Sequence, residues 1–152
     1  MNKEVQSLII KFQETLNGEP WFGRAVYSIL NEIDASKVYQ KPNEQSHSLI
    51  ELLYHMITWT EFTLKRIERD KKNDSDKKDW RVIDPEIHNW ENALAEFVYL
   101  NNQIIHKLSD KPDPFLEETV DFREYNFRYL IEGLTNHHIY HLGQIAWLSK
   151  SL

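Results

Sequence analysis

Residues 127–148, FRYLIEGLTNHHIYHLGQIAWL, combine a helical pattern with three histidines. Apolar and imidazole side chains recur there at alternating spacings of three and four, which is typical of an α-helix that packs along one seam. The seam positions are Phe127, Leu130, Leu134, His137, His141, Gln144 and Leu148. The stretch therefore predicts an amphipathic helix that presents two imidazoles where leucine or isoleucine would usually fill a core.

The same periodicity occurs in the N-terminal part of the chain. Its seam reads Val5, Leu8, Phe12 and Leu16, and then Phe22, Val26, Ile29 and Ile33. The two halves are separated by NGEP, residues 17–20, where Gly18 and Pro20 should kink the helix or restart it. Pro20 is tolerable there as a residue of a first helical turn.

Two more helices are predicted between these regions. One should begin near Ser48, because Ser48 and Glu51 have the spacing of a capping box. Its seam is Ser48, Leu52, His55, Trp59 and Phe62. The other should begin near Pro85 and end before SDKPDP, residues 109–114, because each proline disfavours helix in the residue before it. Its seam is Ile87, Trp90, Leu94, Phe97, Asn101, Ile104 and Leu108.

Four amphipathic helices joined by loops predict an all-α fold, a four-helix bundle. We expect a single domain over residues 1–152, with long connections at 69–84 and 109–121 where the bundle could route a crossover. The run RDKKNDSDKKD, residues 69–79, is charged and polar and has nothing to bury, so it is expected to be a loop. The sequence alone leaves the topology of the bundle open.

Composition narrows the classes of function. The formal charge is -6, which argues against a nucleic acid partner. The N-terminus has no uninterrupted apolar stretch of a signal peptide, and no run approaches the ~18 apolar residues of a membrane span. We therefore expect a cytoplasmic protein without a membrane partner. There is no cysteine, so any metal must be held by nitrogen and oxygen.

The histidines offer such a metal site. His137 and His141 lie four residues apart and should project from one helix face, whereas His138 is turned about 100° away. His55 lies on the seam of another helix and could supply a third nitrogen. A buried neutral imidazole needs both a donor and an acceptor partner, which is hard to arrange for three rings at once. A divalent cation resolves this difficulty, and three ligands leave a coordination position for water or substrate. The alternative is a metal-free bundle in which the histidines are hydrogen-bonded core residues.

Two long motifs resemble the DinB-like superfamily, which also contains the YfiT-like proteins. They are SHSLIELLYHMITWTEF at residues 46–62 and HHIYHLGQIAWL at residues 137–148, supported by GEPW at residues 18–21 and by the tryptophans at 80 and 90. The resemblance implies a four-helix bundle, a homodimer, and a divalent metal on His55, His137 and His141. Zinc and nickel are the first candidates for that metal, since imidazole suits both.

Two polar residues lie near the expected metal. Gln144 shares the face of His137 and His141 and should orient a ligand or a metal-bound water, or else bond to backbone at the seam. Glu51 lies one turn before His55 and could be a fourth ligand, a general base or the capping partner of Ser48. We favour the cap.

Other residues near the site receive weaker predictions. Trp59 is expected to form an apolar wall of the metal cavity or to fill the core. His47 is expected to be a solvated residue at the helix entrance, or to line the mouth of the site. His88 and His106 are given no role.

The leading functional hypothesis is an enzyme whose metal activates a small nucleophile for a small-molecule substrate. The resemblance implies either hydrolase-like chemistry or transfer of a low-molecular-weight thiol, such as bacillithiol or mycothiol, to an electrophile. The alternative is a non-catalytic binding or stress-response module in which the metal joins two helices. The position of Glu51 distinguishes the enzyme from the non-catalytic module. If Glu51 is a fourth protein ligand, the metal has no free position and the non-catalytic module is favoured.

Overall fold

A computed structural model describes residues 1–71 and 78–152 of the chain. The described residues form α-helices and two short 3-10 helices, and they contain no strand beyond an isolated bridge between Thr119 and Asn126. The elements are α1 (Lys3–Asn17), α2 (Val26–Leu30), η1 (Ala35–Lys37), α3 (Leu49–Ile67), α4 (Trp90–Ser109), η3 (Asp113–Glu117) and α5 (Phe127–Ser151). The predicted all-α fold is confirmed.

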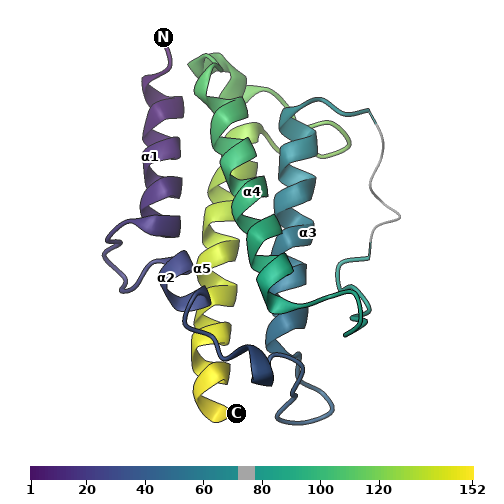
Figure 1. Ribbon diagram of the computed structural model, residues 1–152. Helices are drawn as coiled ribbons and strands as arrows, with labels where there is room; N and C mark the ends of the chain where they lie inside the picture. Colours follow the sequence, from purple (N-terminus) through teal and green to yellow (C-terminus); the bar gives the residue numbers. More distant parts are fainter. Residues whose placement is uncertain (72–77) are drawn as a thin grey trace.

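The four long helices form a bundle, with the short α2 beside it (Figure 1). Helix α3 packs against α4 and α5, and α1 packs against the same two helices. In Figure 1, α1 and α5 run downward while α3 and α4 run upward. Because α3 and α4 are parallel, the long connection between them joins opposite ends of the bundle. The predicted loop at 69–79 falls partly outside the described residues, which exclude 72–77.

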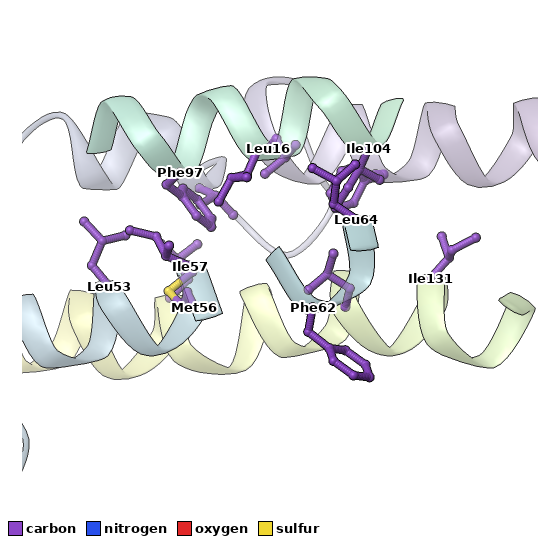
Figure 2. Packing of buried hydrophobic residues seen from close by; sticks show 14 of the residues in the cluster. Leu16, Leu53, Met56, Ile57, Phe62, Leu64, Phe97, Ile104 and Ile131 are labelled. Carbon is purple, nitrogen blue, oxygen red and sulfur yellow. The ribbon is translucent and has the colours of Figure 1, made fainter. Parts of the chain in front are cut away.

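A continuous apolar core fills the space between the helices (Figure 2). Leu53, Met56 and Ile57 of α3 are fully buried, and Phe97 of α4 faces them. Burial of each such side chain contributes about 1.5–3 kcal/mol relative to exposure. This core holds α3 and α5 against each other and so positions the histidines that these two helices contribute to the site described below.

Side chains at the helix starts fix where the site-bearing helices begin. The Glu51 backbone N–H donates to Ser48 Oγ at 3.3 Å, and the Ser48 N–H donates to Glu51 Oε2 at 2.8 Å, so the expected capping box opens α3. At the start of α5, Asn126 Oδ1 accepts from the N–H of Tyr129 at 2.9 Å. Such caps satisfy N–H groups that have no partner inside the helix.

Two predicted helix boundaries were wrong. Helix α4 begins at Trp90, five residues after Pro85, because Asn89 accepts from the N–H of Asn92 and caps the helix there. Before it, the carbonyl of Asp84 accepts from the N–H groups of residues 87 and 88 in a separate turn. Ile87, predicted on the seam, is consequently 66% exposed.

The N-terminal region also differs from its pattern. Helix α1 ends at Asn17, and regular helix resumes only at Val26, so Pro20 is not in a first helical turn. Phe22, which the pattern placed on the seam, lies in the connection and is 44% exposed. The break expected at Gly18 therefore extends from residue 18 to residue 25, whereas the spacing of apolar residues indicated that the helix would resume before Phe22.

Candidate metal centre

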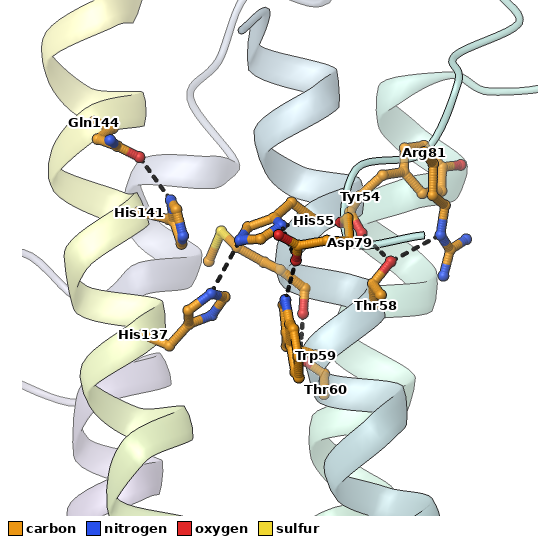
Figure 3. A network of polar contacts seen from close by, with 11 residues as sticks. Tyr54, His55, Thr58, Trp59, Thr60, Asp79, Arg81, His137, His141 and Gln144 are labelled. Carbon is orange, nitrogen blue, oxygen red and sulfur yellow. Dashed lines mark hydrogen bonds and ion pairs between the residues drawn. The ribbon is translucent and has the colours of Figure 1, made fainter. Parts of the chain in front are cut away.

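Three imidazoles meet between α3 and α5 (Figure 3). His55 comes from the middle of α3, and His137 and His141 come from successive turns of α5. One ring nitrogen from each residue lies within 4.8 Å of the other two. Nε2 of His55 and Nε2 of His137 are 3.1 Å apart. The structure thus brings together the three residues that the helical spacing singled out.

The orientation of His55 is set by the segment that precedes α4. Nδ1 of His55 donates to the carbonyl oxygen of Asp79 at 3.0 Å, and Oδ1 of the same residue lies 3.2 Å away. The indole of Trp80 stacks on the imidazole with 4.0 Å between ring centroids and an interplanar angle of 6°. The carbonyl oxygen and Oδ1 of Asp79 can only accept hydrogen bonds. Nδ1 of His55 therefore carries the proton, and the lone pair of its Nε2 faces His137.

His141 is oriented in the same way by a residue of its own helix. Nδ1 of His141 donates to Oε1 of Gln144 at 2.6 Å. Its Nε2 is therefore the nitrogen that is free to face the other two rings (Figure 3). An acceptor on the far nitrogen is the usual arrangement around histidines that bind metals, because it fixes tautomer and ring angle.

Burial favours the neutral form of His137 and His141. Removal from water and the neighbouring His141 and His55 together lower the pKa of His137 to about 4. Burial also lowers the pKa of His141, although its hydrogen bond to Gln144 acts in the opposite direction. Nδ1 of His137 is buried and has no hydrogen-bond partner among the described residues. A neutral imidazole with an accessible lone pair is the form that binds a cation.

The donor set fits a divalent cation. Two nitrogens bound at ~2.1 Å to one cation lie about 3.0–3.4 Å apart in octahedral or tetrahedral geometry. The 3.1 Å between the Nε2 atoms of His55 and His137 lies in that range. Within the described part of the chain, the group of residues able to share a metal consists of these three histidines.

Glu51 does not approach this group. Its carboxylate accepts from the N–H of Ser48 and pairs with Lys41 at 3.1 Å. Its pKa is lowered, since the bonds from Ser48 and Lys41 outweigh the opposing effect of burial. The side chain is therefore engaged at the start of α3, as the capping prediction required.

His138 belongs to a different environment. Its ring is completely buried, and Nε2 lies 3.0 Å from Oδ1 of Asn101 on α4. It packs between Phe12 and Phe97, and burial lowers its pKa to about 3. The turn of about 100° between adjacent helical residues places it on a different face of α5 from His137.

The other histidines lie outside the cluster. His47 stacks on the far face of Trp80, with 3.5 Å between centroids, so His47, Trp80 and His55 form one stack. It remains 43% exposed. Nδ1 of His88 accepts from the N–H of Asp84 at 2.9 Å in the turn before α4, and His106 is exposed.

Sequence reasoning missed the contribution of residues 79–81. The carboxylate of Asp79 accepts from Nε1 of Trp59 at 2.5 Å as well as facing His55. Nε of Arg81 donates to Thr58 Oγ1 at 2.9 Å, which fastens the segment to α3. The side chain of Asp79 is 53% exposed, so the charged run buries nothing at its end, but the prediction did not include these contacts. The available signal was Trp80, an aromatic residue placed directly after that run.

An apolar pocket adjoins the cluster. It is lined by residues of α3 and α5, by Tyr125 in the preceding loop, and by His137 itself. Its volume is about 150 Å³. Trp59, expected as an apolar wall of the metal cavity, lines this pocket beside His137, with 6.4 Å between the two ring centroids.

The chain was compared with models of protein families, with curated proteins and with solved structures. Residues 22–145 match the family model described as the DinB superfamily. No curated protein and no solved structure matches the chain. Within the described residues, none of the helices has the length and apolar character needed to cross a membrane.

Proposed function

Because the chain belongs to the DinB superfamily, we propose that His55, His137 and His141 hold a divalent cation at the centre of an enzyme active site. The observation that carries the proposal is the pair of fixed tautomers. Asp79 and Gln144 accept hydrogen bonds from the Nδ1–H groups of His55 and His141, so that the Nε2 lone pairs of both rings are directed inward. An Nε2–H of His137 could donate to the lone pair of His55 at 3.1 Å, but it could not serve both lone pairs, whereas one cation can be shared by all three nitrogens.

The chemistry supported best is transfer of a low-molecular-weight thiol to a small electrophile. When bound, a divalent cation acidifies a small nucleophile such as a thiol or a water. In the transfer, a carbon–sulfur bond forms, the bond from that carbon to its leaving group breaks, and the thiol proton departs with the leaving group. The chain has no cysteine, so the thiol has to come from a cosubstrate. Hydrolase-like chemistry would use water in its place.

The chain's own residues would orient and desolvate this reaction. Asp79 and Gln144 hold two of the three imidazoles, and the Trp80 indole covers one face of His55. The apolar pocket beside His137 offers a site for substrate close to the three rings. An apolar wall excludes water and strengthens the electrostatic interactions inside the site.

A non-catalytic module, in which the cation only joins α3 to α5, is the alternative. Four protein ligands usually enclose a structural zinc ion, whereas a catalytic site retains a free position. The engagement of Glu51 with Ser48 and Lys41 supports the catalytic proposal, because it occupies the carboxylate that the sequence suggested as a fourth ligand.

The test is metal-dependent conjugation. Protein loaded with zinc or nickel should conjugate bacillithiol to a panel of model electrophiles, such as aryl and alkyl halides, faster than buffer containing the same metal. Metal-free protein and the His141→Ala variant should show only the uncatalysed rate. Failure of metal-loaded protein to exceed that rate with thiol or water as nucleophile would favour the non-catalytic module.

Three further expectations remain predictions. The homodimer implied by the family can be measured by light scattering of purified protein. The cytoplasmic location and the absence of nucleic acid binding can be measured by cell fractionation and by titration with duplex DNA.

A further inference from the structure

The pocket beside the three histidines has a definite size and chemical character. Its volume of about 150 Å³ matches apolar protein cavities that hold a single benzene ring. Helix α3 supplies one wall and α5 the other. The lining residues are Trp59, Thr63, Tyr125, Tyr129, Leu130, Gly133, Leu134 and His137.

The polar atoms of the α3 wall are already occupied. Nε1 of Trp59 donates to Asp79, and Oγ1 of Thr63 donates to the carbonyl of Trp59 at 2.9 Å. As far as the structure is described, the lining contains no Asp, Glu, Lys or Arg. A charged group placed there would lose its hydration without gaining a partner.

The two ends of the pocket differ. His137 lies at one end, among the ligand rings, with its Nδ1 buried. Tyr129, on the pocket wall, is 65% exposed, which gives a ligand access from solvent. Aromatic walls could attract an organic cation, but a divalent ion on His137 would repel it. Aromatic walls next to a bound cation therefore favour an uncharged ring as the ligand of the pocket.

From these features we infer that the pocket binds a neutral, ring-sized apolar group of the substrate and presents the atom attached to it to the metal centre. The inference rests on the proposed function and specifies its substrate class: small electrophiles with an aromatic or similarly compact apolar group. The apolar lining does not suit a charged electrophile, and a long chain would extend beyond the pocket's volume of about 150 Å³.

Gly133 makes the inference testable without touching a ligand. A Cβ added at Gly133 meets nothing within 4 Å, so larger side chains enter open space at the pocket wall. Gly143, on the same helix, has equally open surroundings but does not line the pocket, which makes it the matched control. Replacing either glycine should also favour the helix by up to ~1 kcal/mol.

The experiment measures binding of toluene by saturation-transfer NMR and calorimetry, with tetramethylammonium as the charged comparison. Wild type and Gly143→Leu should bind toluene equally, Gly133→Ala more weakly, and Gly133→Leu at least tenfold more weakly. None should bind tetramethylammonium. Thermal melts establish that each variant folds, and Gly133→Ala provides the test if Gly133→Leu does not fold.

Absence of toluene binding to wild type would overturn the inference, as would equal binding by the two leucine variants or preference for tetramethylammonium. Metal content is measured on the same samples. Stoichiometric metal without toluene binding refutes the pocket assignment and leaves the metal centre standing. Toluene binding by protein that takes up no metal refutes the proposed function instead.

Discussion

Removal of the Gln144 side chain should weaken metal binding without touching a ligand. Oε1 of Gln144 accepts a hydrogen bond from Nδ1–H of His141 at 2.6 Å, and this bond fixes the tautomer whose Nε2 faces the site. Loss of such a partner typically costs 10–100-fold in metal affinity. Because Gln144 is exposed, water can replace the amide in Gln144→Ala, and we expect about tenfold weaker binding, or about 1.4 kcal/mol.

A bulkier apolar residue should have the larger effect. Leucine at position 144 keeps water from the Nδ1 proton, so Gln144→Leu should approach a hundredfold loss, about 2.7 kcal/mol. Gln144→Glu retains an acceptor and should bind at least as tightly as wild type. The assay is competition for zinc against a chromophoric chelator above pH 7, where imidazoles are neutral.

The control lies on the same helix. Asn136 is exposed, and its replacement in Asn136→Ala should change zinc affinity less than twofold. Wild-type affinity in Gln144→Leu would refute the reasoning that an outer hydrogen bond orients His141. An equal loss in Asn136→Ala would show that the effect is a general consequence of altering α5.

Three further predictions concern stability of the metal-free protein. Ser48→Ala removes the cap of α3 and should lower the free energy of unfolding by about 1 kcal/mol in urea titrations; no change would contradict the capping role. Asn101→Leu leaves His138 without its buried partner and should cost about 1–3 kcal/mol in the same assay, whereas a neutral effect would show that this bond contributes nothing. The pKa of His138 is lowered from 6.5 to about 3, so its contribution is fully present above pH 6.5 and is lost as pH falls toward 3. The decrease in the free energy of unfolding should reach on the order of 3 kcal/mol near pH ~4.5 and should be smaller in His138→Gln. Identical pH profiles of wild type and His138→Gln would contradict this prediction.

The repeating three-and-four pattern was sufficient to predict the long helices and the faces they bury. His137 and His141 could be found because residues four apart share a helix face, and His55 because it shares its seam with Leu52 and Trp59. These are local properties of one helix at a time. The packing of α3 against α5 then brings the two faces together.

The partners of His55 could not be predicted in this way. Asp79 and Trp80 lie in an irregular segment whose position depends on bonds to Trp59 and Thr58 of another element. Periodicity carries no information about such contacts. The start of α4 was missed for a related reason, because Pro85 and Asn89 are both compatible with a helix start and the turn formed by Asp84 decides between them.

The most direct test of the account is the metal content of untagged protein, measured by elemental analysis. Wild type should contain one equivalent of a divalent metal per chain, and His55→Ala and His141→Ala should contain almost none. His106→Ala, which alters an exposed histidine of α4, should match wild type. One equivalent of metal retained by either ligand variant, or a wild type that takes up no zinc or nickel, would contradict the claim that these three imidazoles hold a cation.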